Sequence, residues 1–199
     1  MPDPAPVSRE EQKRRTRDAI TFAARGLFVA QGYTETSVNT IARAAGVSRQ
    51  GFYLHFSGKA QIVVELMRRI GPEILAMYGD LDEVEDPDVP AVRAWLEQHA
   101  HVWHRYSMEF AAMEQALAED ADVAAEWFAF TREIVSRLPR ALNAQRRSGA
   151  TEALARARLH AAVMAVDRSF HFLFLRGHTE DQDAELTALA EILSRQLAH

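Results

Sequence analysis

Residues 36–59 read TSVNTIARAAGVSRQGFYLHFSGK, and this stretch decides the fold of the chain. It predicts a short helix over 38–45, a tight turn at Gly46, and a second short helix over 49–56. Glycine suits such a turn because it adopts a positive φ angle without steric cost. Phe52 lies on the inner face of the second helix and would anchor it to a core. We therefore expect a helix-turn-helix unit.

The residues before this unit predict one long helix from Ser8 to Gln31, and residues 1–7 are expected to form a disordered tail. Ser8 can cap the helix, because Glu11 follows three residues later and completes a capping box. Gly32 would end the helix as a C-terminal glycine. Four basic residues lie near the start of this helix: Lys13, Arg14, Arg15 and Arg17. They form either a solvated face or a set of phosphate contacts.

Two motifs in this region are specific in combination. They are Phe28-x-x-x-Gly32-Tyr33-x-x-Thr36-Ser37 and Ala42-x-x-x-Gly46-Val47-Ser48, the second followed by Phe52-Tyr53-Leu54-His55-Phe56 and Lys59. Together they resemble the helix-turn-helix and its lead-in from the TetR family of repressors, over about residues 12–70. The resemblance implies an all-α protein with an N-terminal three-helix DNA-binding domain. It also implies a C-terminal helical domain that binds an effector and forms a homodimer.

Charge is distributed unevenly along the chain. The formal net charge of -5 alone argues against a nucleic-acid partner. Residues 1–70, however, carry 11 Lys and Arg against 6 Asp and Glu, whereas residues 71–199 carry 12 against 22. A basic head on an acidic body is the asymmetry expected of a DNA-binding domain joined to a domain with another task.

The second helix of the unit carries the side chains that suit DNA. Arg49 and Gln50 lie at its N-terminal end, where a helix-turn-helix reads base edges in the major groove. Arginine pairs with guanine and glutamine with adenine through two hydrogen bonds each. The full set of predicted DNA contacts is Thr36, Ser37, Thr40, Ser48, Arg49, Gln50, Gly51, Tyr53, His55 and Lys59. The alternative is a helical hairpin that serves only the core.

The rest of the chain predicts helices and no strands, giving about nine helices in all. We place the domain boundary at residue 58, so that 1–58 form the DNA-binding domain and 59–199 the effector-binding and dimerisation domain. Pro72 should kink or divide the helix that starts at Lys59 and runs to about Tyr78. An acidic exposed linker is expected over 79–90. The later helices are expected over 90–106, 107–118, 123–147 with a bend at Pro139, 152–176, and from about 181 onward.

Aromatic residues concentrate in the C-terminal part. Pockets for small apolar ligands are lined by such residues together with a few polar groups. The predicted effector-binding residues are Trp95, His99, Trp103, Phe110, Met113, Trp127, Phe128, Asp167 and Phe170. For each of them the alternative is a place in the ordinary core. We expect a largely hydrophobic effector.

Affinity for a near-palindromic double-stranded operator requires two copies of the recognition helix. The last two helices carry more apolar surface than one packing face needs, and the family commonly dimerises through this pair. The predicted interface residues are Phe170, Phe174, Leu186, Leu189 and Leu193.

Several other functions are disfavoured by the sequence. The chain has no cysteine, which excludes disulfides and thiolate metal sites and fits a cytoplasmic protein. Glu97, His101 and His104 share a helical face, which suggests a metal site, but a solvated polar face accounts for them better. No phosphate loop, GxSxG or HExxH motif supports an enzyme, and we expect neither a cofactor nor a membrane segment. A repressor is the leading interpretation, with an activator or an effector-independent regulator as alternatives.

Overall fold

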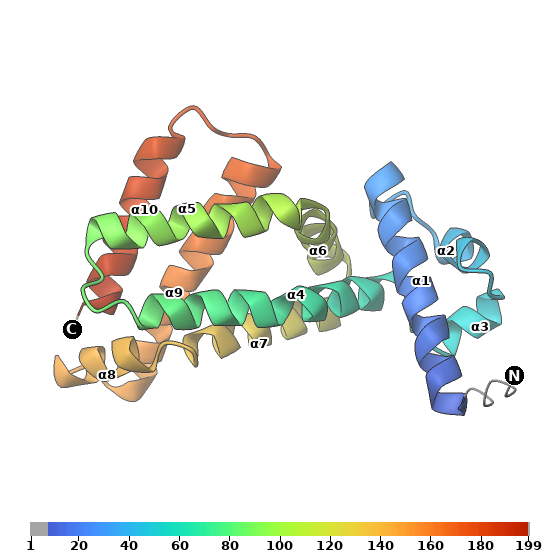
Figure 1. Ribbon diagram of the computed structural model, residues 1–199, viewed down its shortest axis with the longest axis horizontal. Helices are drawn as coiled ribbons and strands as arrows, with labels where there is room; N and C mark the ends of the chain where they lie inside the picture. The colour runs from blue at the N-terminus through green and yellow to red at the C-terminus, as the bar shows by residue number, and fades with distance from the viewer. Residues whose placement is uncertain (1–7, 199) are drawn as a thin grey trace, which may run out of the picture.

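The structure, a computed structural model, describes residues 8–198, and over this range it is built from helices alone (Figure 1). Its elements in chain order are α1 (Arg9–Gln31), α2 (Val38–Ala44), α3 (Arg49–Tyr53), α4 (Lys59–Asp82), α5 (Val89–Arg105), α6 (Ser107–Glu119), α7 (Ala121–Val135), α8 (Pro139–Arg147), α9 (Glu152–Phe170), the π-helical turn η1 (His171–Leu175) and α10 (Gln182–Leu197). The all-α prediction is confirmed. The predicted tail, residues 1–7, lies outside the described residues.

The helices form two groups joined by α4. Figure 1 shows α1, α2 and α3 gathered at one end of the molecule, with α4 leading from them into the larger group. In that group α4 packs against α6 and α7, α5 packs against α10, and α9 packs against α7, α8 and α10. None of the helices in the described range is both long enough and apolar enough to span a bilayer.

Short polar side chains begin the helices where the sequence predicts caps. Ser8 accepts a hydrogen bond from the Glu11 amide at 3.1 Å, which confirms the predicted start of α1. Ser48 caps α3 by accepting from the Gly51 amide at 2.9 Å. Such caps satisfy amides that have no partner inside the helix.

Helix α4 differs from the prediction at two points. Pro72 lies inside it but does not divide it, and the helix continues past Tyr78 to Asp82. Leu81 and Asp82 are buried. The prediction of an exposed linker over 79–90 is therefore wrong in its extent, because only residues 83–88 connect α4 to α5.

The predicted helix over 123–147 is two helices, α7 and α8. Proline has no amide hydrogen, and its ring disfavours a helical conformation in the residue before it, so Pro139 starts a new helix rather than bending an old one. Asp82 supplies the missing cap from a distance. Its carboxylate accepts from the amides of Arg140 at 2.8 Å and Ala141 at 3.0 Å. The end of α4 thereby fixes the start of α8.

This capping contact gives the first prediction. Replacing Asp82 with alanine leaves two amides at the start of α8 without a partner, and we expect a loss of about 1–3 kcal/mol in the free energy of unfolding. Urea denaturation measures this loss. The matched control is Asp80→Ala, since Asp80 is exposed on the same helix. Equal stability of the two variants would contradict the role given to Asp82.

Candidate functional site

The helix-turn-helix is held by buried side chains that continue into the core of the body. Ile20 and Phe28 from α1, Ile41 from α2, and Phe52 and Phe56 from the second half of the unit are all buried. The rings of Phe52 and Phe56 lie 5.9 Å apart. Gly46 has a φ angle of 69°, which satisfies the turn as predicted. The outer face of α3 is thereby fixed relative to α1 and α2.

That outer face presents the two predicted base-reading side chains to solvent. Arg49 and Gln50 are exposed, and Tyr53 is 45% exposed beside them. The Arg49 guanidinium donates to the Asn39 side chain on α2 at 2.9 Å and lies 5.7 Å from the Tyr53 ring. Arg49 is thus oriented before any ligand arrives. Asn39 is not among the residues predicted from the sequence, although its place on the outer side of α2 could have identified it.

Thr36 and Lys59, two of the predicted phosphate contacts, make hydrogen bonds within the protein instead. The Thr36 side chain is 2% exposed and donates to the Gly32 carbonyl at 2.7 Å. The Lys59 ammonium donates to the carbonyls of Tyr33 at 2.9 Å and Thr34 at 3.3 Å, and it lies over the Tyr33 ring. Both residues hold the loop between α1 and α2. We therefore correct the prediction that they contact phosphate through their side chains.

The other predicted contacts divide between capping and exposure. Ser37 caps α2 and lies 2.8 Å from the Thr40 hydroxyl. A Cβ atom on Gly51 would lie 3.2 Å from the Ser48 hydroxyl, so the glycine makes room for the α3 cap rather than for an approaching ligand. His55 is half-buried, and its pKa is lowered by burial and then by the charges of Lys13 and Arg17. It is therefore neutral at pH 7.

The basic cluster of α1 separates into two parts. Arg17 is structural: it donates to the His55 carbonyl at 2.6 Å, pairs with Glu65 at 2.9 Å and lies over the Phe56 ring. Arg14 and Arg15 are exposed and pair with Glu11 of the same helix. Surface pairs of this kind contribute little stability and exchange readily for other partners. Only the exposed part remains available for phosphate.

Helix α6 connects the two groups of helices through polar contacts. The Arg25 guanidinium of α1 pairs with Glu109 at 2.7 Å, and the Glu109 carboxylate is almost fully buried. The Gln115 side chain accepts from the amide and the hydroxyl of Thr34 at 3.2 and 3.0 Å. The same helix supplies Phe110 and Met113 to the interior of the second group. A change in that interior can therefore reach α1.

The interior of the second group contains a small cavity of about 20 Å³. Five predicted effector residues line it: His99, Trp103, Phe110, Trp127 and Asp167. The sequence analysis missed Tyr78, which also lines it, because that residue was expected to end its helix before a linker. The cavity has room for about one water molecule. We call it the inner cavity.

Two titratable groups face the inner cavity with perturbed pKa values. Burial raises the pKa of Asp167 to about 7, helped by the nearby charge of Glu114 and opposed by Arg168. Burial lowers the pKa of His99 to about 3, so its imidazole is neutral. The His99 Nδ1 atom is buried and has no hydrogen-bond partner within residues 8–198. The cavity wall thus includes a buried polar atom, His99 Nδ1, whose hydrogen-bonding capacity the described residues leave unsatisfied.

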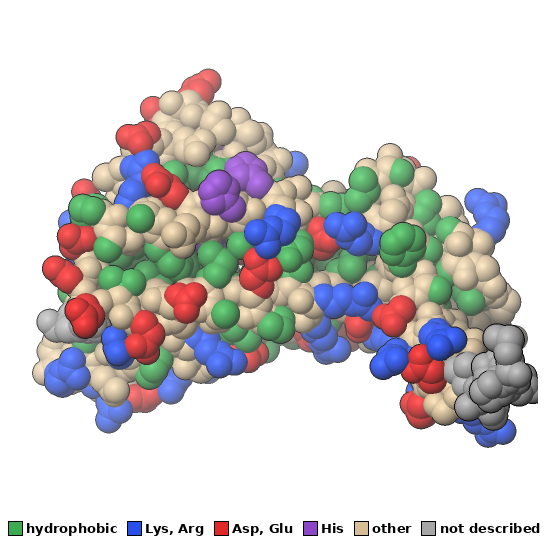
Figure 2. Space-filling view, viewed as in Figure 1, with side chains coloured by type: hydrophobic (Ala, Val, Ile, Leu, Met, Phe, Trp, Pro, Cys, Tyr) green, Lys and Arg blue, Asp and Glu red, His purple; other side chains and the backbone are tan. Residues whose placement is uncertain are grey.

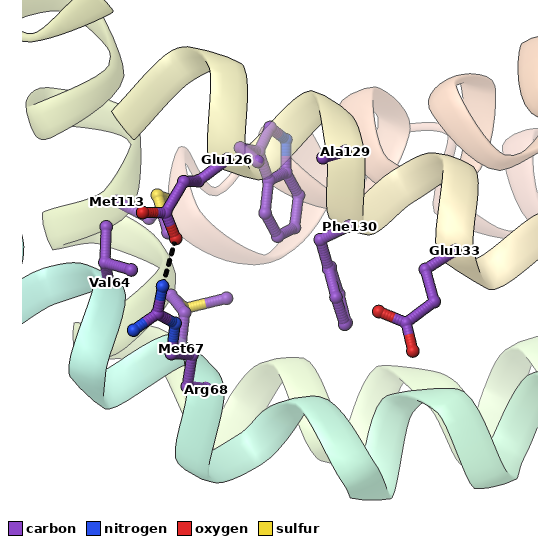
Figure 3. Close-up of a pocket in the computed structure, with 9 residues that line it drawn as sticks. Val64, Met67, Arg68, Met113, Glu126, Ala129, Phe130 and Glu133 are labelled. Carbon is purple, nitrogen blue, oxygen red and sulfur yellow. Dashed lines mark hydrogen bonds and ion pairs between the residues drawn. The ribbon is translucent and has the colours of Figure 1, made fainter. Parts of the chain in front are cut away.

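A second, more open pocket of about 250 Å³ lies between α4 and α7 (Figure 3), and we call it the outer pocket. Trp127 lines both this pocket and the inner cavity, so its indole separates them. Met113 and Phe130 add apolar surface. Arg68 from α4 meets Glu126 from α7 at 2.8 Å, the contact drawn as a dashed line in Figure 3.

Three predicted effector residues lie elsewhere. Phe128 is 51% exposed and packs on His160, because adjacent helical residues point in different directions and Trp127 takes the inward one. Phe128 therefore lines neither the inner cavity nor the pocket between α4 and α7, but a separate surface hollow with His160. Trp95 is buried behind His99, stacks on it, and donates to the Met77 carbonyl at 2.9 Å. Phe170 is fully buried against His99 and Trp103, so it supports the cavity wall without lining it.

The predicted interface residues are largely internal. Phe170, Leu186, Leu189 and Leu193 are each at most 5% exposed, because α10 uses these leucines to pack on α5 and α9. Phe174 is half-buried against His104 and Phe170. The prediction that these side chains meet a second copy is corrected. The exposed apolar side chains of the same segments are Leu154, Phe172 and Ile192.

The histidines of α5 do not form a metal site within the described residues. No group of three or more His, Asp or Glu side chains there is arranged to hold a metal ion. His101 and His104 are exposed, and Figure 2 shows histidine side chains at the surface of the larger group of helices. They belong to a solvated face.

The fold and the exposed recognition helix define a helix-turn-helix protein with an all-helical body. Residues 20–66 match the family model for bacterial regulatory proteins of the tetR family. The regulator TcmR of Streptomyces glaucescens is 38% identical over 82 residues, which are 41% of this chain and 36% of that protein. The chain spans between 34% and 58% of the length of the first curated relatives it matches.

Solved structures share the whole fold. A tetR-type regulator of Syntrophomonas wolfei has a TM-score of 0.68 at 14% identity, over 92% of this chain and 97% of that one. SmeT in complex with triclosan has a TM-score of 0.58 at 23% identity, over 92% of this chain and 90% of that one. The DNA-binding unit of this chain is therefore similar to that of tetR-family bacterial regulatory proteins, and the whole chain shares its fold with the solved structures. These curated relatives are named as HTH-type transcriptional regulators.

The buried carboxyl of Asp167 gives a prediction on stability. Its folded-state pKa of about 7 exceeds the ordinary 3.8, so the folded protein binds the proton more tightly than the unfolded chain does. The protonated Asp167 therefore contributes its full stabilisation below about pH 4. This contribution to the free energy of unfolding, at most about 4 kcal/mol, is lost as the pH rises through about 7. In thermal unfolding, the stability of Asp167→Asn relative to the wild type should therefore increase as the pH rises from about 4 to about 7. A stability difference independent of pH would contradict this assignment.

Proposed function

We propose that the chain is a DNA-binding transcriptional regulator, in the first instance a repressor that a small hydrophobic effector releases from its operator. The observation that carries the proposal is the exposed pair Arg49 and Gln50, presented on a capped helix within the region that matches the family. Residues 1–58 would form the DNA-binding domain and residues 59–199 the regulatory domain.

Arg49 and Gln50 would read base edges, with Tyr53 beside them for a thymine methyl or a phosphate. Ser37, Thr40 and Ser48 would face the phosphates, since their hydroxyls lie at the starts of α2 and α3. Helix N-termini favour anions through their free amides and the helix dipole. His55 would add a neutral polar group rather than a positive charge.

The regulator would act as a homodimer on a near-palindromic operator. Leu154 lies in the first turn of α9, Phe172 lies in η1 and Ile192 lies on α10, and each is about 45% exposed. Between them α9 exposes the small residues Ala157 and Ala161 at helical spacing. Exposed apolar surface of this kind on two neighbouring helices suits a self-complementary contact with a second copy. We therefore assign the interface to these side chains.

Effector binding would be transmitted through α4 and α6. An effector in the outer pocket would lie between α4 and α7 beside the Arg68–Glu126 pair, and its entry into the inner cavity would displace Trp127, so its binding would shift α7 against α4. Helix α4 begins at Lys59, which holds the loop of the DNA-binding unit, and α6 contacts α1 through Glu109. The DNA-competent population then falls in proportion to the effector's preference for the other arrangement.

The SmeT structure, which shares this fold, was solved with triclosan, so the architecture accommodates a small molecule in at least one protein. An activator or an effector-independent regulator would use the same DNA-binding unit. A reporter assay with the chain's own promoter separates these: a repressor lowers expression in the absence of effector, and an activator raises it.

The first test concerns DNA. Arg49→Ala removes a bidentate base contact, and we expect at least a tenfold loss of affinity for the DNA upstream of the chain's own gene. A gel-shift titration at fixed salt measures this loss. Wild-type binding should also weaken steeply as salt rises. The control is Arg147→Ala, since Arg147 is equally exposed but lies on α8. Unchanged affinity of the Arg49 variant would overturn the site assignment.

The second test concerns the dimer. Leu154→Arg combined with Ile192→Arg places four positive charges across a two-fold contact, and we expect a monomer in sedimentation velocity with the helical content retained. Val29→Arg is the control, because Val29 is 62% exposed but lies on α1. A dimer that persists in the double variant would place the interface elsewhere.

A further inference from the structure

We propose that the effector is an amphiphilic cation, with its positive charge at the Asp167 carboxylate in the inner cavity and its apolar body in the outer pocket. This inference rests on the proposed function, because it names the chemical class of the molecule that the regulatory domain senses. It narrows the expectation of a hydrophobic effector to one that carries an ammonium or a similar charged group.

The position of Asp167 is the starting point. It lies on α9, is 9% exposed, and lines the inner cavity. Its carboxylate has neither a hydrogen bond nor an ion pair to any other side chain or amide in the described residues. The adjacent Arg168 is exposed and pairs with Glu114 at 3.3 Å. The protein therefore places an acid inside an apolar cavity without providing its counter-charge.

Such an arrangement is costly in the empty protein. A buried ion without a partner costs several kcal/mol, and native proteins normally pair it or satisfy it with hydrogen bonds. Asp82 shows how this chain satisfies a buried carboxylate elsewhere, with two backbone amides. The lack of comparable partners at Asp167 means that a bound cation would find a carboxylate already desolvated and unpaired.

The walls of the cavity also suit a cation. Trp103 stacks on Phe110 with ring centroids 4.1 Å apart, and Tyr78 and Trp127 complete the aromatic lining. Aromatic faces attract cations, and the attraction strengthens where water is excluded. His99 is neutral, so it adds no repelling charge. A carboxylate surrounded by aromatic rings binds an ammonium better than it binds a neutral or acidic group.

Access to Asp167 runs through the outer pocket. Its apolar lining includes Met67, Met113 and Phe130, and two acids, Glu126 and Glu133, lie at its border. The inner cavity is too small for a cationic head until Trp127 moves, and that movement would join the two spaces. The effector would therefore be elongated, with an apolar part that stays between α4 and α7.

The test uses a matched pair of probes. One is phenylbutyl-trimethylammonium, and the other is its neutral analogue with carbon in place of the ammonium nitrogen. Tryptophan fluorescence, from Trp103 and Trp127, reports binding. We expect the wild type to bind the cation at least tenfold more tightly than the neutral analogue. In Asp167→Asn that preference should disappear while the neutral analogue still binds, which shows that the variant is folded.

The control variant is Glu114→Gln, which removes a nearby acid that does not line the cavity. It should keep the preference for the cation within about threefold. Equal binding of the two probes by the wild type, a preference that survives in Asp167→Asn, or its loss in Glu114→Gln would each overturn the inference. So would a failure of both probes to bind at millimolar concentration.

The pH dependence provides a second readout. Cation affinity should fall about tenfold between pH 8 and pH 6 as Asp167 takes up its proton, and this fall should be absent in Asp167→Asn. The groups that face Asp167 are Tyr78, His99, Glu114 and Arg168, with His171 next to Glu114. Of these, His99 stays neutral throughout this range.

The outcome is separable from that of the proposed function. If the neutral analogue binds as tightly as the cation and releases the operator, the regulator stands and only the charge assignment fails. If the cation binds with the expected preference but no promoter fragment is bound by the ligand-free protein, the binding site stands and the regulatory function fails.

Discussion

The continuity of α4 is the constraint on which the rest of the structure depends. The helix has 24 residues, so it extends about 36 Å from the DNA-binding unit to the far side of the body. At its first residue Lys59 holds the loop between α1 and α2, and at its last Asp82 caps α8. Because one rigid element makes both contacts, a displacement at either end is carried to the other.

The packing at Gly71 and Pro72 explains how α4 remains one continuous helix although it contains a proline. Proline removes one backbone hydrogen bond and crowds the preceding turn, so it weakens the helix locally. Gly71 compensates on the buried side. A Cβ atom there would lie 3.3 Å from the Phe130 ring, so the glycine lets α7 approach α4 closely. The packing of Phe130 supports the turn that proline weakens.

Much of the DNA-binding unit could be predicted from the local sequence. The caps at Ser8 and Ser48, the turn at Gly46 and the buried Phe52 follow from rules that act within a few residues. The exposure of Arg49 followed from the same pattern. Long-range contacts could not be predicted this way. The cap that Asp82 supplies to α8 is an example, because Arg140 and Ala141 follow Asp82 by 58 and 59 positions in the sequence.

The same limit explains the errors at the candidate sites. Leu186, Leu189 and Leu193 form an apolar stripe, but the stripe alone does not say whether α5 or a second copy covers it. Trp127 and Phe128 have similar chemistry, and only the rotation of α7 decides which one faces inward. Lys59 looked available for phosphate until the fold brought the Tyr33 carbonyl within 2.9 Å of it.

The contacts between α1 and α6 have a thermodynamic consequence. The hydrogen bonds that α6 makes with α1 and with the loop after α1 are polar contacts: the Arg25 guanidinium of α1 donates to Glu109, and the amide and hydroxyl of Thr34 in the loop donate to Gln115. Water can replace such partners at a small net cost, whereas parting an apolar seam would expose hydrocarbon. One oxygen of Glu109 has no hydrogen-bond partner within residues 8–198. This part of the joint is therefore polar, and its hydrogen bonds can exchange with water without exposing hydrocarbon.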